Sequence, residues 1–163
     1  MKKTIAVLVE NHFGVLTHVS GLFSARGFNI DSLAVGETED PTVSRMTIVV
    51  DGDERTLDQV KKQLNRLIDT IKIIDLTEED YIGRELVLVR VEVSTKNRSE
   101  VIQIADTFEA KIVDVKKDTL TIEATGDENK TKSLIEILKP FGISEIVRTG
   151  RIAIARGKGK DRE

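Results

Sequence analysis

The chain has 163 residues, of which 39% are hydrophobic and 33% are charged. With only 2 prolines and 11 glycines it is neither disordered nor of low complexity, so we expect one domain or two small ones. The 25 basic and 28 acidic residues give a net charge of -3, which argues against a general nucleic-acid or anionic-lipid binder. Cysteine is absent, and His12 and His18 cannot form a zinc cage alone, so we expect no metal site and no thiol chemistry.

Near the amino terminus, the apolar run of residues 5–9 ends at Glu10. A signal peptide needs an apolar run of about 7 to 15 residues, and a membrane-spanning helix needs about 20. This run is too short for either. We therefore expect a cytoplasmic protein with no membrane association.

Hydrophobic periodicity divides the first 76 residues into strand, helix, two strands, helix and strand. The expected strands are residues 4–10, 29–38, 43–50 and 71–76. The middle pair forms a hairpin around residues 39–41. Two helical faces lie between the strands, formed by Val15, Leu16, Val19, Leu22 and Phe23 and by Leu57, Val60, Leu64 and Leu67.

The same order of elements repeats in the second half. Expected strands are residues 84–94, 112–115, 120–124 and 143–148. The helical faces are Val101, Ile104, Ala105 and Phe108, and Leu134, Ile137, Leu138 and Phe141. The fold class is therefore α+β, with two tandem ferredoxin-like βαββαβ units.

The domain boundaries follow from this repeat. We expect a first domain over residues 1–76, a linker over 77–80 and a second domain over 81–163. Residues 151–155 could add a short strand to the second domain, and a polar tail begins at about residue 156.

No catalytic constellation is evident. The chain lacks a Walker loop, a nucleophile elbow and a dinucleotide-binding fingerprint. The adjacent pair Glu78 and Glu79 is typical of a solvated surface, and His18 borders an apolar helical stripe without an evident nucleophile beside it. We expect a protein without catalytic residues.

The turn between the first strand and the first helix, residues 10–16, is a candidate binding site. A helix N-terminus exposes backbone N–H groups with partial positive charge, so it can bind a carboxylate without Arg or Lys. Gly14 would let a ligand approach the backbone. The alternative is an ordinary turn in which Asn11 caps the helix. Asn29 could likewise contact a ligand or serve only its own loop, because a loop Asn often forms a hydrogen bond with its own backbone.

Several blocks of the sequence resemble the ACT domain of the small regulatory subunit of acetohydroxyacid synthase, also called acetolactate synthase. They are residues 7–11 with 14–16, residues 21–33 and residues 40–48. The second half resembles the same subunit in pattern, including residues 148–151 and 156–157. The resemblance thus covers essentially the whole chain.

This resemblance implies a non-catalytic subunit that activates a catalytic subunit and confers feedback inhibition by a branched-chain amino acid, usually valine. It implies a homodimer with the effector at the interface. The implied effector-binding residues are Asn11, Gly14, Val15 and Leu16 of one protomer and Asn29 and Ile30 of the other, with His12 and Phe13 as neighbours. No cofactor is expected on this chain; the catalytic partner would carry thiamine diphosphate, Mg²⁺ and FAD.

Two other functions share this strand order. An acylphosphatase binds phosphate in the turn after its first strand with the help of an Arg, and residues 10–16 contain none. An RNA-binding sheet of the RRM type presents aromatic residues on its central strands, and aromatic residues make up only 4% of this chain. Both alternatives are weaker than the regulatory one.

Overall fold

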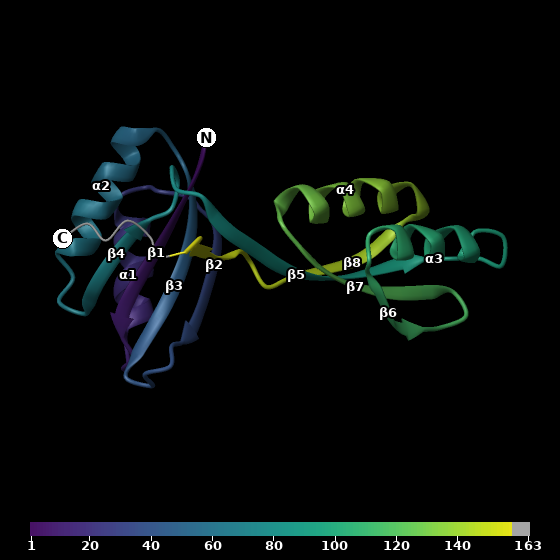
Figure 1. Ribbon diagram of the computed structural model, residues 1–163, viewed down its shortest axis with the longest axis horizontal. Helices are drawn as coiled ribbons and strands as arrows, with labels where there is room; N and C mark the ends of the chain where they lie inside the picture. The colour runs from purple at the N-terminus through teal and green to yellow at the C-terminus, as the bar shows by residue number, and fades with distance from the viewer. Residues whose placement is uncertain (158–163) are drawn as a thin grey trace. The chain divides into compact units, whose positions relative to one another are not determined.

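A computed structural model describes residues 1–157 (Figure 1), so most of the expected polar tail lies outside the described residues. The chain forms two compact units. One comprises Met1–Ile82 together with the segment from Arg151, and the other comprises Gly83–Gly150. Within residues 1–157, no helix has both the length and the apolar character of a membrane span.

The first unit is a four-stranded antiparallel sheet with two helices. Its strands are β1 (Lys2–Glu10), β2 (Ile30–Glu37), β3 (Val43–Asp51) and β4 (Thr70–Asp75), in the order β2-β3-β1-β4. The helices α1 (Val15–Ala25) and α2 (Glu54–Asn65) connect them. Buried side chains of β1, β3 and both helices form a single core cluster, so the helices share one face of the sheet.

The two helices of the first unit differ from the prediction in which residues they bury and where they end. In α1, Val15, Val19 and Phe23 are buried at a spacing of four, whereas Leu16 is 48% exposed, so the buried stripe is narrower than the sequence indicated. In α2, the Asp53 side chain accepts a hydrogen bond from the backbone N–H of Thr56 at 2.8 Å. That helix ends at Asn65, so Leu67 packs from the following turn rather than from the helix.

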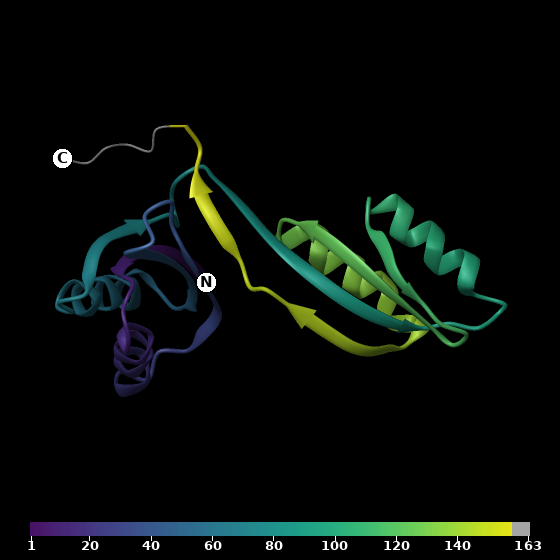
Figure 2. The same ribbon diagram turned by 90° about the horizontal axis from the view of Figure 1, so that it is seen from below.

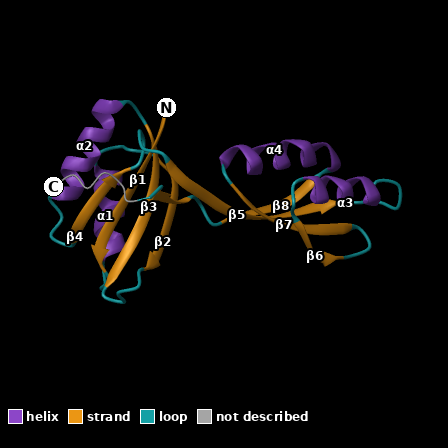
Figure 3. Cartoon of the chain, viewed as in Figure 1, coloured by secondary structure: helices purple, strands orange, loops and turns teal. Residues whose placement is uncertain are grey.

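The second unit repeats the arrangement (Figure 3). Strands β5 (Tyr81–Glu92), β6 (Lys111–Val115), β7 (Thr119–Gly126) and β8 (Ile143–Arg148) lie in the order β6-β7-β5-β8. Helices α3 (Arg98–Thr107) and α4 (Glu128–Leu138) lie on one side of this sheet (Figure 1). The predicted fold class, two tandem ferredoxin-like βαββαβ units, is confirmed.

Two expected helical positions in the second unit differ from the prediction. Ile137 is 44% exposed, and Ile135 is buried in its place. Phe141 lies in a short 3-10 helix, η1 (Lys139–Phe141), because Pro140 cannot continue the hydrogen-bond ladder of α4. The helix therefore ends earlier than its apolar periodicity indicates.

The segment after Gly150 belongs to the first unit, although the sequence placed it in the second domain. Its strand β9 (Ile152–Ala155) pairs with β5 (Figure 2). Ala153 packs with Ala6 and Leu76 on the sheet face opposite the helices. The backbone carbonyl of Ala153 also accepts a hydrogen bond from Arg45 Nη2 at 2.8 Å. These contacts explain why the segment after Gly150 belongs to the first unit.

The boundary between the units also differs from the expected linker over residues 77–80. The first unit extends to Ile82, so the chain passes into the second unit within strand β5. The Arg156 side chain binds the Asp80 carboxylate at 3.1 Å, which further ties the returning segment to the first unit. Residues 77–82 are therefore part of a folded unit.

We expect Ala153→Asp to destabilise the first unit by roughly 3 kcal/mol, because it buries an unpaired carboxylate. Ile154→Asp is the matched control: Ile154 is 60% exposed whereas Ala153 is 5% exposed, and the change should cost about 1 kcal/mol or less. Denaturant unfolding, with amide exchange of β1 and β4, measures both effects. Equal destabilisation by the two variants would contradict the packing described here.

Candidate functional site

The turn between β1 and α1 leaves the start of α1 without a compensating side chain. Gly14 is the N-cap residue, with φ 87° and ψ -8°, and no side chain caps the helix. The first turn of α1 also contains no acidic residue. In contrast, aspartates cap α2 and α4, and α3 has Glu100 in its first turn. Among residues 1–157, neither a capping side chain nor an acid of the first turn therefore offsets the partial positive charge at the start of α1.

Backbone donors at this helix start are open to a ligand. Over residues 1–157, the structure records no acceptor for the N–H groups of Gly14, Leu16 and Thr17. The N–H of Val15 reaches only the carbonyl of His12, at a long 3.5 Å. A carboxylate placed here would accept hydrogen bonds from these free N–H groups.

Asn11 holds the turn against the β2–β3 hairpin instead of capping the helix. Its backbone N–H donates to the carbonyl of Thr42 at 2.7 Å. Its side-chain Nδ2 donates to the Pro41 carbonyl at 2.9 Å and to Glu37 Oε1 at 3.2 Å. The helix-cap alternative for Asn11 is therefore not what the structure shows.

The apolar residues of the turn divide into buried and exposed ones. Val15 is 3% exposed and belongs to the core, so it can offer a ligand only its backbone. Leu16 and Phe13 are exposed, at 48% and 102%. An apolar ligand side chain could thus contact Leu16 and Phe13 but not the Val15 side chain.

Asn29 and Ile30 do not lie near this turn within one chain. They follow the C-terminal end of α1, and an 11-residue helix is about 16 Å long. Ile30 pairs with Val50 and packs on the edge of the core, whereas Asn29 donates from Nδ2 to Asp31 Oδ1 at 3.1 Å. A single chain therefore brings together only the turn residues of the predicted set.

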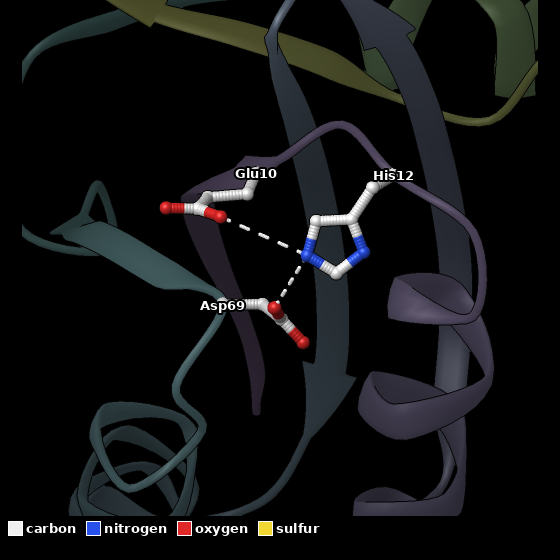
Figure 4. A group of neighbouring side chains, drawn as sticks. All are labelled: Glu10, His12 and Asp69. Carbon is white, nitrogen blue, oxygen red and sulfur yellow. Dashed lines mark ion pairs between the residues drawn. The ribbon is translucent and has the colours of Figure 1, made fainter.

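His12 points away from the helix start and toward Asp69, which precedes β4. Its Nε2 lies 2.7 Å from Asp69 Oδ1 and 3.7 Å from Glu10 Oε2 (Figure 4). The Phe13 carbonyl, hydrogen-bonded to the ring, raises the pKa of His12 above its ordinary value, and the two carboxylates act in the same direction. The sequence did not single out Asp69, because only the pairing of β1 with β4 brings it beside the turn.

Comparison with known proteins identifies the family to which this chain belongs. Residues 5–72 match the model of the ACT domain of small subunits of the acetohydroxyacid synthase type, and residues 84–157 match the model of the small subunit of acetolactate synthase. The chain belongs to the acetolactate synthase small-subunit family.

Full-length relatives support this membership of the small-subunit family. A probable acetolactate synthase small subunit from Archaeoglobus fulgidus is 52% identical over 98% of this chain and 100% of its own length. The small subunit from Aquifex aeolicus is 50% identical over 95% of this chain and 81% of its own length. The crystal structure of the Thermotoga maritima small subunit has a TM-score of 0.87 at 36% identity, over 96% of this chain and 98% of that one.

Membership of the small-subunit family gives this chain a regulatory role, as the resemblance implied. The match to the ACT domain contains the whole β1–α1 turn. The match to the second family model continues to residue 157, and so includes β9. The segment from Arg151 to residue 157 thus lies within the part of the sequence that matches this second family model.

Gly14, the N-cap of α1, and Gly21, within α1, allow a matched test of the left-handed cap. Gly14→Ala should destabilise the chain by about 1 to 2 kcal/mol, because the added Cβ meets no atom within 4 Å and the positive φ alone is unfavourable. Gly21→Ala, in the middle of the same helix and equally open, should stabilise it by about 0.5 to 1 kcal/mol. Denaturant unfolding of both variants measures whether the two changes in the free energy of unfolding have opposite signs. Stabilisation by Gly14→Ala would contradict the positive φ at this position.

Proposed function

We propose that this small subunit binds and activates the catalytic subunit of acetolactate synthase in the cytoplasm, and makes it sensitive to feedback inhibition by a branched-chain amino acid, most often valine. The observation that carries the proposal is the uncapped start of α1 inside the region that matches the ACT domain. Such a helix start binds anions through backbone N–H groups. An amino acid supplies a carboxylate for it.

The chemistry of the turn suits a small apolar amino acid. The free N–H groups of Gly14, Leu16 and Thr17 would donate hydrogen bonds to the carboxylate. Asn11 uses Nδ2 for its described side-chain bonds, so Oδ1 can accept from the ammonium group. Exposed Leu16 offers apolar surface for the aliphatic side chain.

The distance between the turn and Asn29 favours a homodimer in which two chains complete each site. If Asn29 and Ile30 contact the effector, they belong to the other protomer, because α1 separates them from the turn of their own chain. Strand β2, from Ile30, lies at an edge of the first sheet and can serve such pairing. A two-fold dimer would then contain two equivalent sites.

Regulation would follow from the position of the effector between protomers. An effector that binds one arrangement of the dimer more tightly shifts the population toward that arrangement. Couplings of about 1 to 3 kcal/mol change the affinity of a second site by roughly 5- to 150-fold. Thiamine diphosphate, Mg²⁺ and FAD belong in this proposal to the catalytic partner.

The two alternative functions gain no support from the described residues. The β1–α1 turn carries no Arg for an acyl phosphate. On the sheet face opposite the helices of the first unit, Ala153 packs against Ala6, where an RNA-binding sheet would expose aromatic residues.

Reconstitution with an acetolactate synthase catalytic subunit tests the regulatory function. Adding the full chain should raise the rate of acetolactate formation, and valine should lower that rate. Gly14→Asp should weaken valine inhibition at least about ten-fold while leaving activation intact, because its carboxylate would face the effector's own. Titration of the rate with valine, isoleucine and leucine measures both properties.

The control for this variant is Gly14→Asn. Asn has nearly the same shape as Asp and also tolerates positive φ, so it keeps the backbone without the charge. Valine inhibition should survive better in Gly14→Asn than in Gly14→Asp. Unchanged inhibition in Gly14→Asp would place the effector elsewhere, whereas absence of activation by the unmodified chain would reject the regulatory pairing itself.

Mixing two variants tests whether two chains share each site. In a mixed dimer of Gly14→Asp with Asn29→Ala, one site carries both changes and the other carries neither. Calorimetry of an equal mixture should therefore show native-affinity valine binding at roughly one site in four, which neither parent shows alone. If each site used only one chain, no native site would appear, and the shared-site arrangement would be refuted.

A further inference from the structure

A mixed histidine and carboxylate cluster lies on the β4 side of the β1–α1 turn. Glu10 ends β1, His12 follows in the turn, and Asp69 precedes β4. The Glu10 N–H donates to the Asp69 carbonyl at 2.9 Å, and the His12 N–H donates to the Glu10 carbonyl at 3.1 Å. One donor atom from each side chain lies within 4.8 Å of the others (Figure 4).

The hydrogen bond on the other ring nitrogen determines what Nε2 of His12 can bind. Nδ1 lies 3.1 Å from the carbonyl oxygen of Phe13, which can only accept, so Nδ1 carries a proton. In the neutral ring, Nε2 then presents a lone pair to the carboxylates of Asp69 and Glu10. A proton on Nε2 or a metal ion would offset the repulsion between this lone pair and the carboxylates.

The surroundings of Asp69 resemble the outer shell of a metal site. Its side chain is only 9% exposed, and its second oxygen, Oδ2, lies 3.3 Å from Nδ1 of His18. This contact directs Oδ1 toward His12. A metal-bound histidine typically bonds a carbonyl or carboxylate through its other nitrogen, as His12 does with Phe13.

We propose that Glu10, His12 and Asp69 bind a divalent transition-metal ion of the Zn²⁺ or Ni²⁺ class. An imidazole nitrogen with two carboxylates favours these ions over Mg²⁺ and Ca²⁺, which prefer oxygen donors. Metal–ligand bonds of about 2.0 to 2.2 Å place donor atoms roughly 3 to 3.5 Å apart. The present separations of 2.7 and 3.7 Å from Nε2 bracket this range.

The solvent exposure and the net charge of this cluster also favour a bound metal ion. The side chains of His12 and Glu10 are 50% and 59% exposed, so water can reach the cluster and complete the coordination. Two carboxylates around one imidazole leave a net negative charge, whether or not the ring is protonated, and a divalent cation would neutralise it. Counting only cysteine and histidine led the sequence to predict no metal site; the fold adds these carboxylates. The inference is independent of effector binding and of the catalytic partner.

Titration of the untagged full chain with ZnCl₂, NiCl₂ and MgCl₂ tests the proposal. Calorimetry should detect about one Zn²⁺ or Ni²⁺ per chain, with a raised unfolding temperature, and no comparable effect of Mg²⁺. His12→Gln removes the nitrogen ligand and should weaken Zn²⁺ binding at least 100-fold. His18→Gln touches only the outer shell and should weaken it about 10-fold.

Unfolding of the metal-free variants controls for their stability, which these exposed side chains should change little. Equal Zn²⁺ affinity in the unmodified chain and in His12→Gln would show binding elsewhere and overturn the proposal. Absence of Zn²⁺ and Ni²⁺ binding to the unmodified chain would show that only a proton occupies the gap, and would overturn it equally.

Discussion

The β1–α1 turn is held by one backbone hydrogen bond to each side of the central strand. Glu10 donates to Asp69 beside β4, and Asn11 donates to Thr42 beside β3. Strand β1 is itself fixed, because Ile5, Ala6 and Val7 are fully buried, with the helices on one face and Ala153 on the other side near Ala6. The position of α1's first N–H groups and of His12 follows from this anchoring.

Gly14 shows how local stability and binding oppose each other at this turn. Relative to Gly, a Ser or Asp cap at a helix start adds only about a few tenths of a kcal/mol, so α1 loses little stability by having Gly14 there. Burial of Val15, Val19 and Phe23 offsets this loss, since each large apolar side chain contributes about 1.5 to 3 kcal/mol. The core can therefore maintain a helix whose first turn remains open to an anion.

The sequence predicted what depends on local periodicity and repetition. The continuous apolar, β-branched run within residues 4–10 and the repeated order of elements were sufficient for both ferredoxin-like units. It could not predict the return of residues 151–157 to the first unit, because Ala153 contacts Ala6 and Leu76 across a large separation in the chain. The sequence indicated the β1–α1 turn through Gly14. Nothing in the sequence around Asp69 indicates a site, because only the pairing of β1 with β4 brings Asp69 beside His12.

The second unit explains by contrast why the first one carries the candidate effector site. Its corresponding turn, between β5 and α3, has Asn97 at the N-cap position, with φ -113° and its side-chain oxygen accepting from the Ser94 N–H at 2.6 Å. Glu100 lies in the first turn of α3 and already neutralises the helix dipole. An incoming carboxylate would meet this acidic side chain. The two units thus share a fold, and neither α1 nor α3 has a side-chain cap, but only α1 also lacks an acidic residue in its first turn.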